Sequence, residues 1–352
     1  MRHLLENTTW EIICPVTFRH KGVPRRIDVA LTDLRRSSVL PWERVKIVHT
    51  DLAAPIDTGT SLRGLRQKDV NYIINAASES HVDRSIDQPR PFVENNVGVM
   101  LSMLEWARDC PNLEAFVQVS TDEVYGPAPV GADSAEWDPI VPSNPYSASK
   151  AAQEALAVAW WRTYGLPLIL TNTMNMVGET QDPEKYMPMV IRRALAGEQI
   201  TIHAAPDGTV GSRFYLHARN LADAILYLVN VFNDDSAQVH FTSFTEGLRY
   251  SAGANRPLRF NVVGEQELDN LQFARIIRDE VVRYAPQIGL SVPDLDEWYT
   301  LTNFHESRPG HDLRYALTGD RMRKIGWEPP VPLIESVRKT VRWELDHRAD
   351  WL

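Results

Sequence analysis

A chain of 352 residues is long enough for one large or two modest domains, and its formal net charge of −9 argues against a nucleic-acid partner. Nucleic-acid affinity depends on clustered Lys and Arg, and no basic stripe is evident. The two cysteines, Cys14 and Cys110, lack the spacing of metal ligands. Neither a signal peptide nor an apolar run near the ~18 residues of a membrane helix is evident. We therefore expect a cytoplasmic protein without metal or membrane partners.

Strand-like apolar runs alternate with helical patterns in the first half of the chain. This rhythm is typical of a Rossmann-like α/β fold, in which helices cover a doubly wound parallel sheet. After residue 173 the pattern becomes irregular, so we expect a dinucleotide-binding domain at 1–173 and a smaller α/β substrate lobe at 174–352, with some chain crossing back to the first domain. The expected strands are 10–16, 45–49, 70–75, 115–120 and 167–173, and the expected helices are 92–108, 147–164, 188–196, 218–231 and 270–284.

The amino-terminal end departs from this pattern. A doubly wound nucleotide domain opens with a strand, a Gly-rich turn and a helix, yet this chain begins in what looks like the first helix, Arg2–Asn7, and contains no GxGxxG or GxxGxxG. The first strand is usually central, so without it the neighbouring strands would lack a partner and a cofactor pyrophosphate would lack its amide cradle. We therefore expect an incomplete first domain and a natural chain that begins upstream of Met1.

Proton-transfer groups gather around one expected strand end. Residues 120–126 follow a buried run, and open α/β sheets bind ligands at the carboxyl ends of their strands. Asp122 and Glu123 lie in this turn, and Tyr146 and Lys150 share one helix face because they are four residues apart. An ammonium beside a phenol lowers the pKa of the phenol, so Tyr146 is expected to accept a hydroxyl proton. Hydride transfer to nicotinamide requires that proton to leave, which suggests oxidoreductase chemistry.

Each of these motifs also has a simpler interpretation. A Tyr and a Lys at this spacing are common on solvated helix faces, and adjacent carboxyls occur in solvated turns and helix N-caps. The two motifs are expected to meet in one cleft, and this convergence favours the catalytic interpretation.

Five motifs together resemble the extended short-chain dehydrogenase/reductases and, within them, the nucleotide-sugar 4,6-dehydratases. The likeness covers nearly the whole chain. Epimerases and decarboxylases of the same superfamily share the Tyr/Lys pair but usually lack the Asp–Glu pair after Thr, so they are one alternative. A non-catalytic nucleotide-sugar-binding protein is another, because the Gly-rich element is missing. The motifs are Ala77–Ile86, Ser120–Gly126, Tyr146–Lys150, Pro183–Pro188 and Arg308–Asp312.

The resemblance implies dehydration of a nucleotide-diphosphate hexose, with dTDP-glucose as the first candidate, to its 4-keto-6-deoxy product by internal hydride transfer. Tyr146, paired with Lys150, would take the proton of the 4-hydroxyl, and Thr121 would bind the 4-oxygen. The resulting ketone acidifies carbon 5, so Glu123 can act as base there while Asp122 protonates the departing 6-hydroxyl. Adjacent carboxyls suit these roles because like charges push their pKa values apart.

The resemblance also implies residues that bind cofactor and substrate. Arg213 follows Gly-Ser where the family has Arg-Asp-Trp, and Asn175 begins Asn-Met-Val-Gly where the family has Asn-Asn-Tyr-Gly, so the sugar and base preferences stay open. Each substrate residue taken singly can also be a loop salt bridge. The cofactor set is Arg19, Asp51, Leu52, Ala76, Ala77, Ser78, Asn96, Val119, Tyr146 and Lys150, and the substrate set is Ser80, His81, Asn175, Glu184, Lys185, Arg213, Asn261, Arg308 and His311.

The cofactor and the oligomeric state follow from the same resemblance. NAD is the first choice, but residues 14–21 contain no carboxylate and three potential cations, so NADP is an alternative, and an exposed basic loop is the simpler interpretation. The family also implies a homodimer formed by two helices per subunit, one of which contains Trp160 and Trp161.

Overall fold

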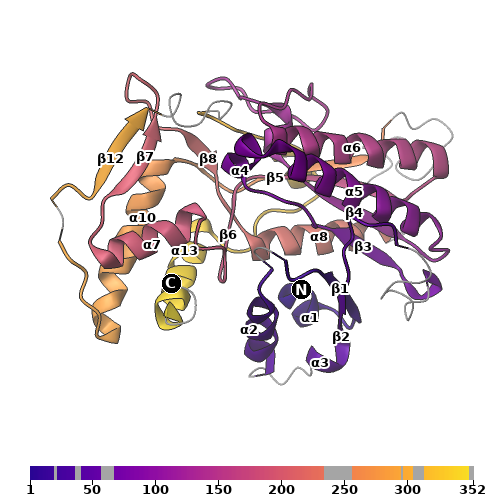
Figure 1. Cartoon of the computed structure of the whole chain (residues 1–352), viewed down its shortest axis with the longest axis horizontal. Coiled ribbons are helices and arrows are strands. Elements are labelled where there is room, and N and C mark those ends of the chain that lie inside the picture. The colour runs from indigo at the N-terminus through magenta and orange to yellow at the C-terminus, as the bar shows by residue number, and fades with distance from the viewer. Residues whose placement is uncertain are drawn as a thin grey trace.

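The computed structural model describes residues 1–19, 22–35, 41–56, 67–233, 256–294, 296–303 and 313–348. Its centre is a four-stranded parallel sheet with the strand order β10–β5–β4–β3 (Figure 1). Strands β4, β5 and β10 are buried along their whole length, as parallel strands covered on both faces should be. The strands are β3 (Tyr72–Asn75), β4 (Ala115–Thr121), β5 (Leu168–Thr173) and β10 (Leu258–Val262).

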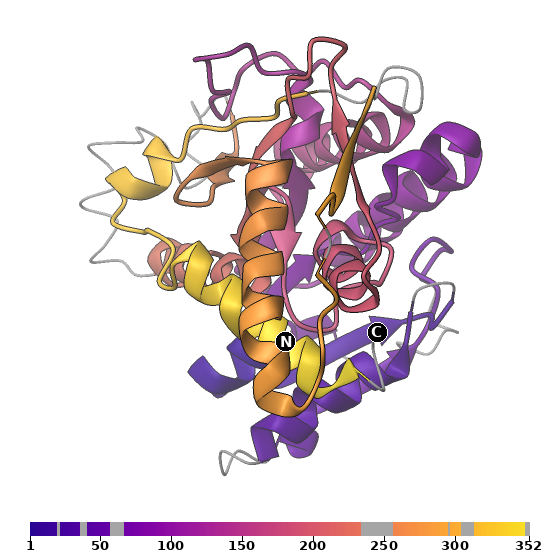
Figure 2. The ribbon, with the colours of Figure 1, turned by 90° about the vertical axis from the view of Figure 1, so that its left-hand side faces the viewer.

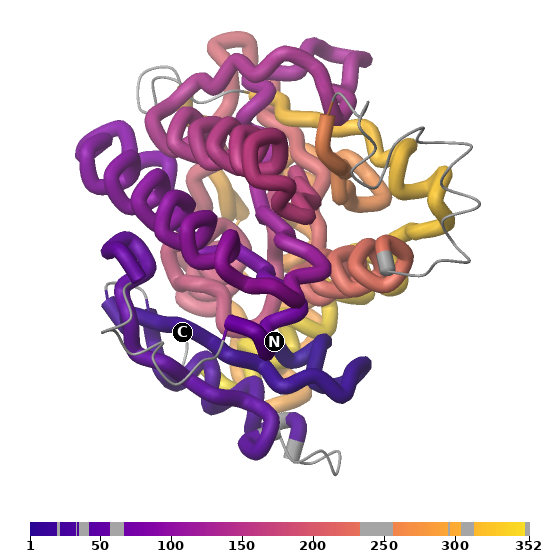
Figure 3. The backbone as a smooth tube through the Cα atoms, turned by 90° about the vertical axis from the view of Figure 1, so that its right-hand side faces the viewer, coloured from indigo at the N-terminus to yellow at the C-terminus, as the bar shows by residue number. Residues whose placement is uncertain are grey.

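Helices cover both faces of this sheet. Helices α5 (Pro89–Arg108) and α6 (Pro145–Tyr164) run side by side over one face, and α8 (Ala218–Asn233) covers the other (Figures 1 and 3). Successive side chains of a strand point to opposite faces, so Phe116 packs on the α5/α6 side while Val117 packs on the α8 side. The expected doubly wound Rossmann-like arrangement is confirmed.

Helix α6 carries two of the expected catalytic residues, and local signals define both of its ends. Asn144 caps its first turn in a reciprocal pair with Ser147, and a proline occupies the first helical position. Gly165 ends the helix in the left-handed conformation with φ 72°, which glycine adopts without steric cost. The helix therefore begins directly beside the carboxyl ends of the central strands.

An amino-terminal unit, comprising the described residues of 2–49, forms a second, smaller sheet. Its two strands pair in parallel with each other, and within the described part of the chain neither pairs with the four-stranded sheet. The unit lies at the bottom of Figures 1 and 3. The ring of Trp10 stacks on Tyr72 of β3, with centroids 4.6 Å apart. Its elements are α1 (Arg2–Asn7), β1 (Ile12–Val16), α2 (Pro24–Arg35), α3 (Pro41–Arg44) and β2 (Val45–His49).

The carboxyl-terminal part of the chain builds a second lobe around its own apolar core. Three helices, α7, α10 and α13, contribute most of this core, and Figure 2 shows α10 and α13 crossing on the near side. β10 leaves this lobe to join the main sheet, and it is not among the strands expected from the sequence. The helices of this lobe are α7 (Tyr186–Ala196), α10 (Asn270–Tyr284) and α13 (Leu333–Asp346), whereas α12 (Asp320–Lys324) packs against β10 of the main sheet. The short strands are β6 (Met176–Val177), β7 (Ile200–Ala204), β8 (Ser212–Phe214), β9 (Leu216–His217), β11 (Glu267–Asp269) and β12 (Tyr299–Asn303).

The remaining described elements are short. Helix α4 (Val82–Asp87) precedes α5, and single turns of 3₁₀ helix occur at η2 (Gln67–Asp69), η3 (Asp122–Tyr125) and η4 (Ala285–Ile288). None of the helices in the described ranges combines the length and apolar character needed to cross a bilayer.

Candidate active site

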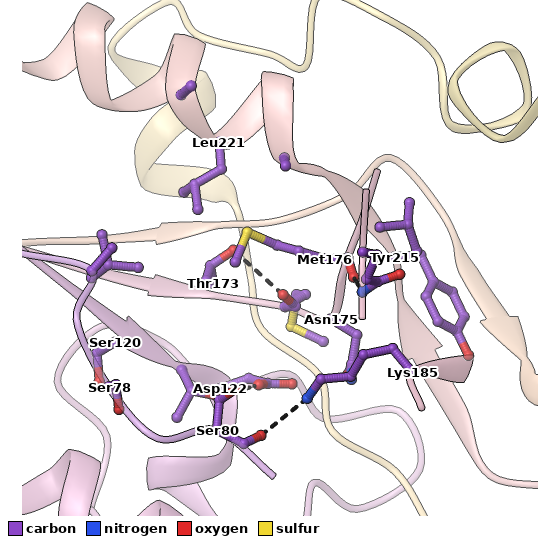
Figure 4. Close-up of a pocket in the computed structure, with 18 of the residues that line it drawn as sticks. Ser78, Ser80, Ser120, Asp122, Thr173, Asn175, Met176, Lys185, Tyr215 and Leu221 are labelled. Atoms are coloured by element: carbon purple, nitrogen blue, oxygen red, sulfur yellow. Dashed lines mark hydrogen bonds between the residues drawn. The ribbon is translucent and has the colours of Figure 1, made fainter. Parts of the chain in front are cut away.

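A cavity of about 480 Å³ opens at the carboxyl ends of β3, β4 and β5 (Figure 4). This is the edge of a parallel sheet at which ligands bind in open α/β folds. Both expected catalytic motifs contribute to its wall, so they do converge on one cleft. The polar residues that line it include Ser78, Ser80, Ser120, Thr121, Asp122, Glu123, Tyr146, Lys150, Asn175, Gln181 and Lys185.

The turn after β4 places two adjacent carboxyls in this wall. Thr121 ends the strand, and its hydroxyl accepts a hydrogen bond from the amide of Glu123 and donates one of 2.8 Å to Asp122 Oδ1. Gly126 closes the turn with φ 77°, and a Cβ at this position would lie 2.3 Å from the carbonyl oxygen of Val141. Only glycine fits there, so the turn geometry depends on it.

Asp122 is the buried member of the carboxyl pair. Its exposed fraction is 3%, and its Oδ2 atom has no hydrogen-bond partner among the described residues. Burial raises the pKa of Asp122 to about 6, although the hydrogen bond from Thr121 and the charge of Arg213 oppose the rise. A carboxyl with this pKa holds a proton far more readily near neutral pH than an exposed aspartate does.

Glu123 has a different environment on the same turn. It is partly exposed, and one of its carboxylate oxygens accepts a 3.1 Å hydrogen bond from Asn144 Nδ2. Asn144 is also the N-cap of α6, so the start of that helix holds the Glu123 side chain. Two neighbouring carboxyls in unlike environments are the pattern that separates an acid from a base.

Lys150 and Tyr146 do not interact as the sequence predicts. Lys150 Nζ donates to the Val119 carbonyl at 2.8 Å and to Gln153 Oε1 at 2.7 Å, and burial lowers its pKa to about 8. Burial raises the pKa of Tyr146, and the charge of Glu123 adds to the rise. The expectation that Lys150 lowers the pKa of Tyr146 is wrong for this structure, because the ammonium is directed at other acceptors while the phenol lies among carboxyls.

Ser120 offers an unused hydroxyl to a ligand. Its side chain is 3% exposed, it lines the cavity next to Ser78, and its Oγ has no hydrogen-bond partner in the described ranges (Figure 4). A buried hydroxyl without a partner costs free energy, and a polar ligand group would remove that cost.

No group of three or more His, Cys, Asp or Glu in the described ranges is arranged to hold a metal ion.

The expected adenosine-side residues lie at a second cavity of about 360 Å³ beside the amino-terminal unit. Arg19 and Asp51 both line it, and Arg19 Nη1 lies 2.5 Å from Asp51 Oδ2. The cation that the sequence offers to a 2′-phosphate is therefore engaged by a carboxylate. His20 and Lys21 lie outside the described residues.

The other expected cofactor residues divide between cavity and core. Ala76 and Val119 line the main cavity, whereas Leu52 and Ala77 pack in the apolar core under α5. Asn96 is fully buried and lines neither cavity; its side chain bonds the backbone of Glu79 and the hydroxyl of Ser149. Its position in this structure is that of a support for the loop after β3.

Several expected substrate residues face the main cavity. Lys185 Nζ donates a 3.1 Å hydrogen bond to the backbone oxygen of Ser80, and Asn175 lines the same wall (Figure 4). His81 caps α4 just outside the lining, and its Nε2 lies 3.6 Å from a carboxylate oxygen of Glu184. Burial lowers the pKa of His81, and the neighbouring Lys185 lowers it further.

Two further expected substrate residues, Arg213 and Asn261, do not line the cavity. Arg213 is 4% exposed, and its guanidinium donates to the carbonyls of Ser212 and Leu313. Asn261 is fully buried and donates to the carbonyl of Ser134. Arg308 and His311 lie outside the described residues.

The sequence analysis missed the apolar wall of the cavity, which helix α8 supplies. Ala218, Leu221, Ala222 and Ile225 line the cavity opposite the carboxyls, and Figure 4 shows Leu221 on this side. Their spacing of three and four residues marks one helix face and could have indicated a shared surface. Nothing in the sequence distinguishes a face that lines a cavity from one that packs in a core.

Comparison with known proteins assigns the chain to a family. A model of the NAD dependent epimerase/dehydratase family matches residues 2–241. The chain therefore belongs to the NAD dependent epimerase/dehydratase family.

Individual relatives are more specific. A curated relative, dTDP-glucose 4,6-dehydratase 1 from Escherichia coli (strain K12), is 32% identical over 365 residues, which cover 99% of this chain and 89% of the relative. The dTDP-glucose 4,6-dehydratase DesIV from Streptomyces venezuelae, solved as a double mutant with NAD bound, is similar in structure with a TM-score of 0.72 and 29% identity, covering 97% of this chain and 89% of DesIV. A UDP-glucuronic acid 4-epimerase from Bacillus cereus shares the fold at 17% identity, with a TM-score of 0.71 and coverage of 98% and 94%.

Proposed function

We propose that this protein is a lyase that dehydrates dTDP-glucose to its 4-keto-6-deoxy product using bound NAD. The observation that carries the proposal is the carboxyl pair: Asp122, buried with a raised pKa, stands next to Glu123 in one cavity with Tyr146. An epimerase needs no acid to protonate a leaving hydroxyl. The dehydratases at about 30% identity over nearly the full chain support the same choice.

The side chains act in sequence on the sugar. Tyr146 acts in its deprotonated form and takes the proton of the 4-hydroxyl, and Thr121, whose hydroxyl lies between Tyr146 and Asp122, binds the oxygen that becomes the ketone. Glu123 removes the proton of carbon 5, and Asp122 donates its proton to the departing 6-hydroxyl. Bound NAD would supply reversible hydride transfer between carbon 4 and carbon 6, and Glu123 would return its proton to carbon 5 as carbon 6 receives the hydride.

The residues present fit a nicotinamide dinucleotide. Ser120 presents a buried, unpartnered hydroxyl to the cavity, and Lys150 beside it is held by the Val119 carbonyl. At the second cavity Asp51 lines the wall where it can contact the adenosine part of the cofactor, and its pairing with Arg19 weakens the case for a 2′-phosphate. These residues favour NAD over NADP, in line with the NAD-bound relatives.

Mass spectrometry of dTDP-glucose incubated with the purified chain and NAD tests the proposal. Loss of one water is the expected result. An isomer of dTDP-glucose, which has the same mass, would indicate an epimerase. In a parallel incubation with a UDP-uronate, loss of carbon dioxide would indicate a decarboxylase. A nucleotide sugar that is bound but not converted would indicate a binding protein. A Glu123→Gln variant that still made the keto-deoxy sugar would remove Glu123 from the base role.

We propose in addition a homodimer formed through α5 and α6. Val93 and Leu101 of α5 and Tyr164 at the end of α6 are among the exposed large apolar side chains, and α5 and α6 lie side by side on the outside of the molecule (Figure 3). Such a surface is suited to a copy of itself related by a twofold axis. Sedimentation should give a dimer, and a species that stays monomeric at every concentration would contradict this.

We also propose a cytoplasmic location. Cys14 and Cys110 are both free thiols in the structure, and burial raises the pKa of the Cys110 thiol to about 12. Proteins of reducing compartments keep such thiols unpaired. Cell fractionation that recovers the protein with the cytosol would agree with this proposal, and recovery outside the cell would contradict it.

A further inference from the structure

A buried ion pair lies between the main sheet and α6, near the turn that follows β4. Arg259 of β10 and Glu154 of α6 are each about 1% exposed, and Arg259 Nη2 bonds a carboxylate oxygen of Glu154. Asn172 of β5, fully buried, lies between them: its Oδ1 accepts from Arg259 Nε at 2.9 Å, and its Nδ2 donates to Glu154 Oε1 at 2.8 Å. Two consecutive elements, α6 and β5, and the distant strand β10 thus meet in one closed set of hydrogen bonds.

This set is joined directly to the turn that carries the carboxyls. Asn172 Nδ2 also donates to the backbone carbonyl of Thr121 at 3.0 Å. At the other end of the turn, the Arg259 guanidinium lies 5.1 Å from the ring centroid of Tyr125. Both ends of the turn that places Asp122 and Glu123 are therefore held by the same buried group.

The set also reaches Lys150. Glu154 follows Lys150 by one helical turn, and its charge opposes the fall in the Lys150 pKa that burial causes. None of Arg259, Glu154 and Asn172 lines the cavity, so they act only through the residues they hold.

A contribution to stability is a weak explanation for such a pair. Removing two charges from water costs free energy, and replacing a buried ion pair by apolar side chains of similar volume is often neutral or stabilising. Removing one partner alone is costly, because it leaves a buried charge without compensation. A role in fixing the geometry of the turn after β4 explains better why Arg259 and Glu154 pair next to that turn.

We propose that Arg259, Glu154 and Asn172 are positioning residues that fix the Thr121–Tyr125 turn in its catalytic geometry. The inference rests on the proposed function for its effect on turnover, but its effect on the turn itself is independent of any substrate. Misplacing a reacting group by about 1 Å can cost roughly 100-fold in rate. Loss of the set should therefore lower kcat while KM, which reflects contacts in the cavity, stays unchanged.

The test compares wild type with a paired variant, Arg259→Met with Glu154→Leu, in the full-length protein. We expect the variant to fold with a melting temperature near that of wild type, kcat to fall about 100-fold at constant KM, and amide hydrogen exchange to rise within 121–126. Arg259→Lys keeps the charge but not the two-armed contact, so its kcat should lie between those of wild type and the paired variant. The matched control is Glu280→Gln, which disturbs a carboxylate that is 3% exposed and pairs with Arg283 and Arg342 in the second lobe, and it should leave kcat unchanged.

Two results would overturn the inference. One is a paired variant that has the wild-type kcat and the wild-type exchange rate in 121–126. The other is an exchange increase spread evenly over the sheet, since that would mark a purely structural role. If wild type itself makes no keto-deoxy sugar, the proposed function fails, and the exchange comparison still decides this inference.

Discussion

The four-stranded sheet and the two-stranded amino-terminal sheet hold their functional side chains in opposite ways. In the four-stranded sheet, β4 and β5 are buried at every position, and the catalytic turn that follows β4 is bonded to buried side chains of α6, β5 and β10. In the amino-terminal unit, β1 is half-buried throughout, and only Val48 of β2 is buried. There, Arg19, with a side chain 62% exposed, is fixed by one ion pair to Asp51.

The difference follows from what each region has to do. Proton transfer needs groups held to within a fraction of an ångström, and buried hydrogen-bond networks supply that rigidity. Recognition of a ribose needs less precision, and an exposed ion pair contributes only about 0–1 kcal/mol. Four predictions test this contrast, in decreasing order of expected effect.

Tyr146→Phe should abolish most of the activity. Tyr146 in its deprotonated form is the expected acceptor of the 4-hydroxyl proton, and loss of a general base lowers the rate by about 10²–10⁴-fold. The measurement is kcat for dTDP-glucose, with Tyr164→Phe as the control, since Tyr164 lies at the exposed end of α6. A Tyr146→Phe enzyme within a few-fold of wild type would exclude the phenol as the base.

The same truncation should cost far more in one sheet than in the other. Ile169 of β5 is fully buried, so Ile169→Ala should lower the free energy of unfolding by about 2–5 kcal/mol. Ile47 of β2 is 39% exposed, so Ile47→Ala should cost less than about 1 kcal/mol. Urea unfolding of both variants gives the comparison, and equal losses would show that the amino-terminal unit is as tightly built as the main sheet.

Asp122→Asn should stabilise the protein while it removes the acid. The raised pKa of Asp122, about 6, means that the folded state disfavours the anion, so the native carboxyl costs stability above its unfolded pKa of about 3.9. At pH 7 the variant should gain roughly 1–3 kcal/mol, and the gain should disappear as the pH falls toward 4. Thermal melts at the two pH values decide the matter: an equal gain at both would mean that burial does not disfavour the Asp122 anion.

Asp51→Asn should have the smallest effect on stability and a visible effect on cofactor choice. Loss of an exposed ion pair should change the free energy of unfolding by less than about 1 kcal/mol. It also releases the Arg19 guanidinium, so the ratio of NADP affinity to NAD affinity should rise. Fluorescence titration with both dinucleotides measures the ratio, and Asp109→Asn at the carboxyl-terminal end of α5 serves as the surface control.

Local patterns made the central part of the site predictable from the sequence. The buried run before Thr121, the helix spacing of Tyr146 and Lys150, and the alternation of strands and helices all depend on neighbours in the chain. The structure brings those residues to one cavity, as expected.

Contacts between distant segments explain what the sequence analysis missed. β10 joins the main sheet through pairing with β5, and Asn261 on it is buried by contacts with Ser134 that no local pattern announces. The Tyr146 pKa was predicted in the wrong direction because helix spacing shows which side chains share a face but not which acceptor an ammonium selects. Arg213 stays a predicted substrate residue; the contacts of its guanidinium with the carbonyls of Ser212 and Leu313 are a feature that its motif does not indicate.

The pairing of β1 with β2 alone has a thermodynamic consequence for ligand binding. Among the described residues this sheet shares no strand pairing with the main sheet, so it can open separately, as a cooperative unit with its own, smaller unfolding free energy. A ligand that touches both Asp51 and Ser120 would bind only when the two units are folded and together, and at a concentration 100 times its Kd it would add about 2.7 kcal/mol to the stability of that state. Such a dinucleotide would be a structural clamp as well as a reactant, and the free protein would show two melting transitions that merge into one as the ligand saturates.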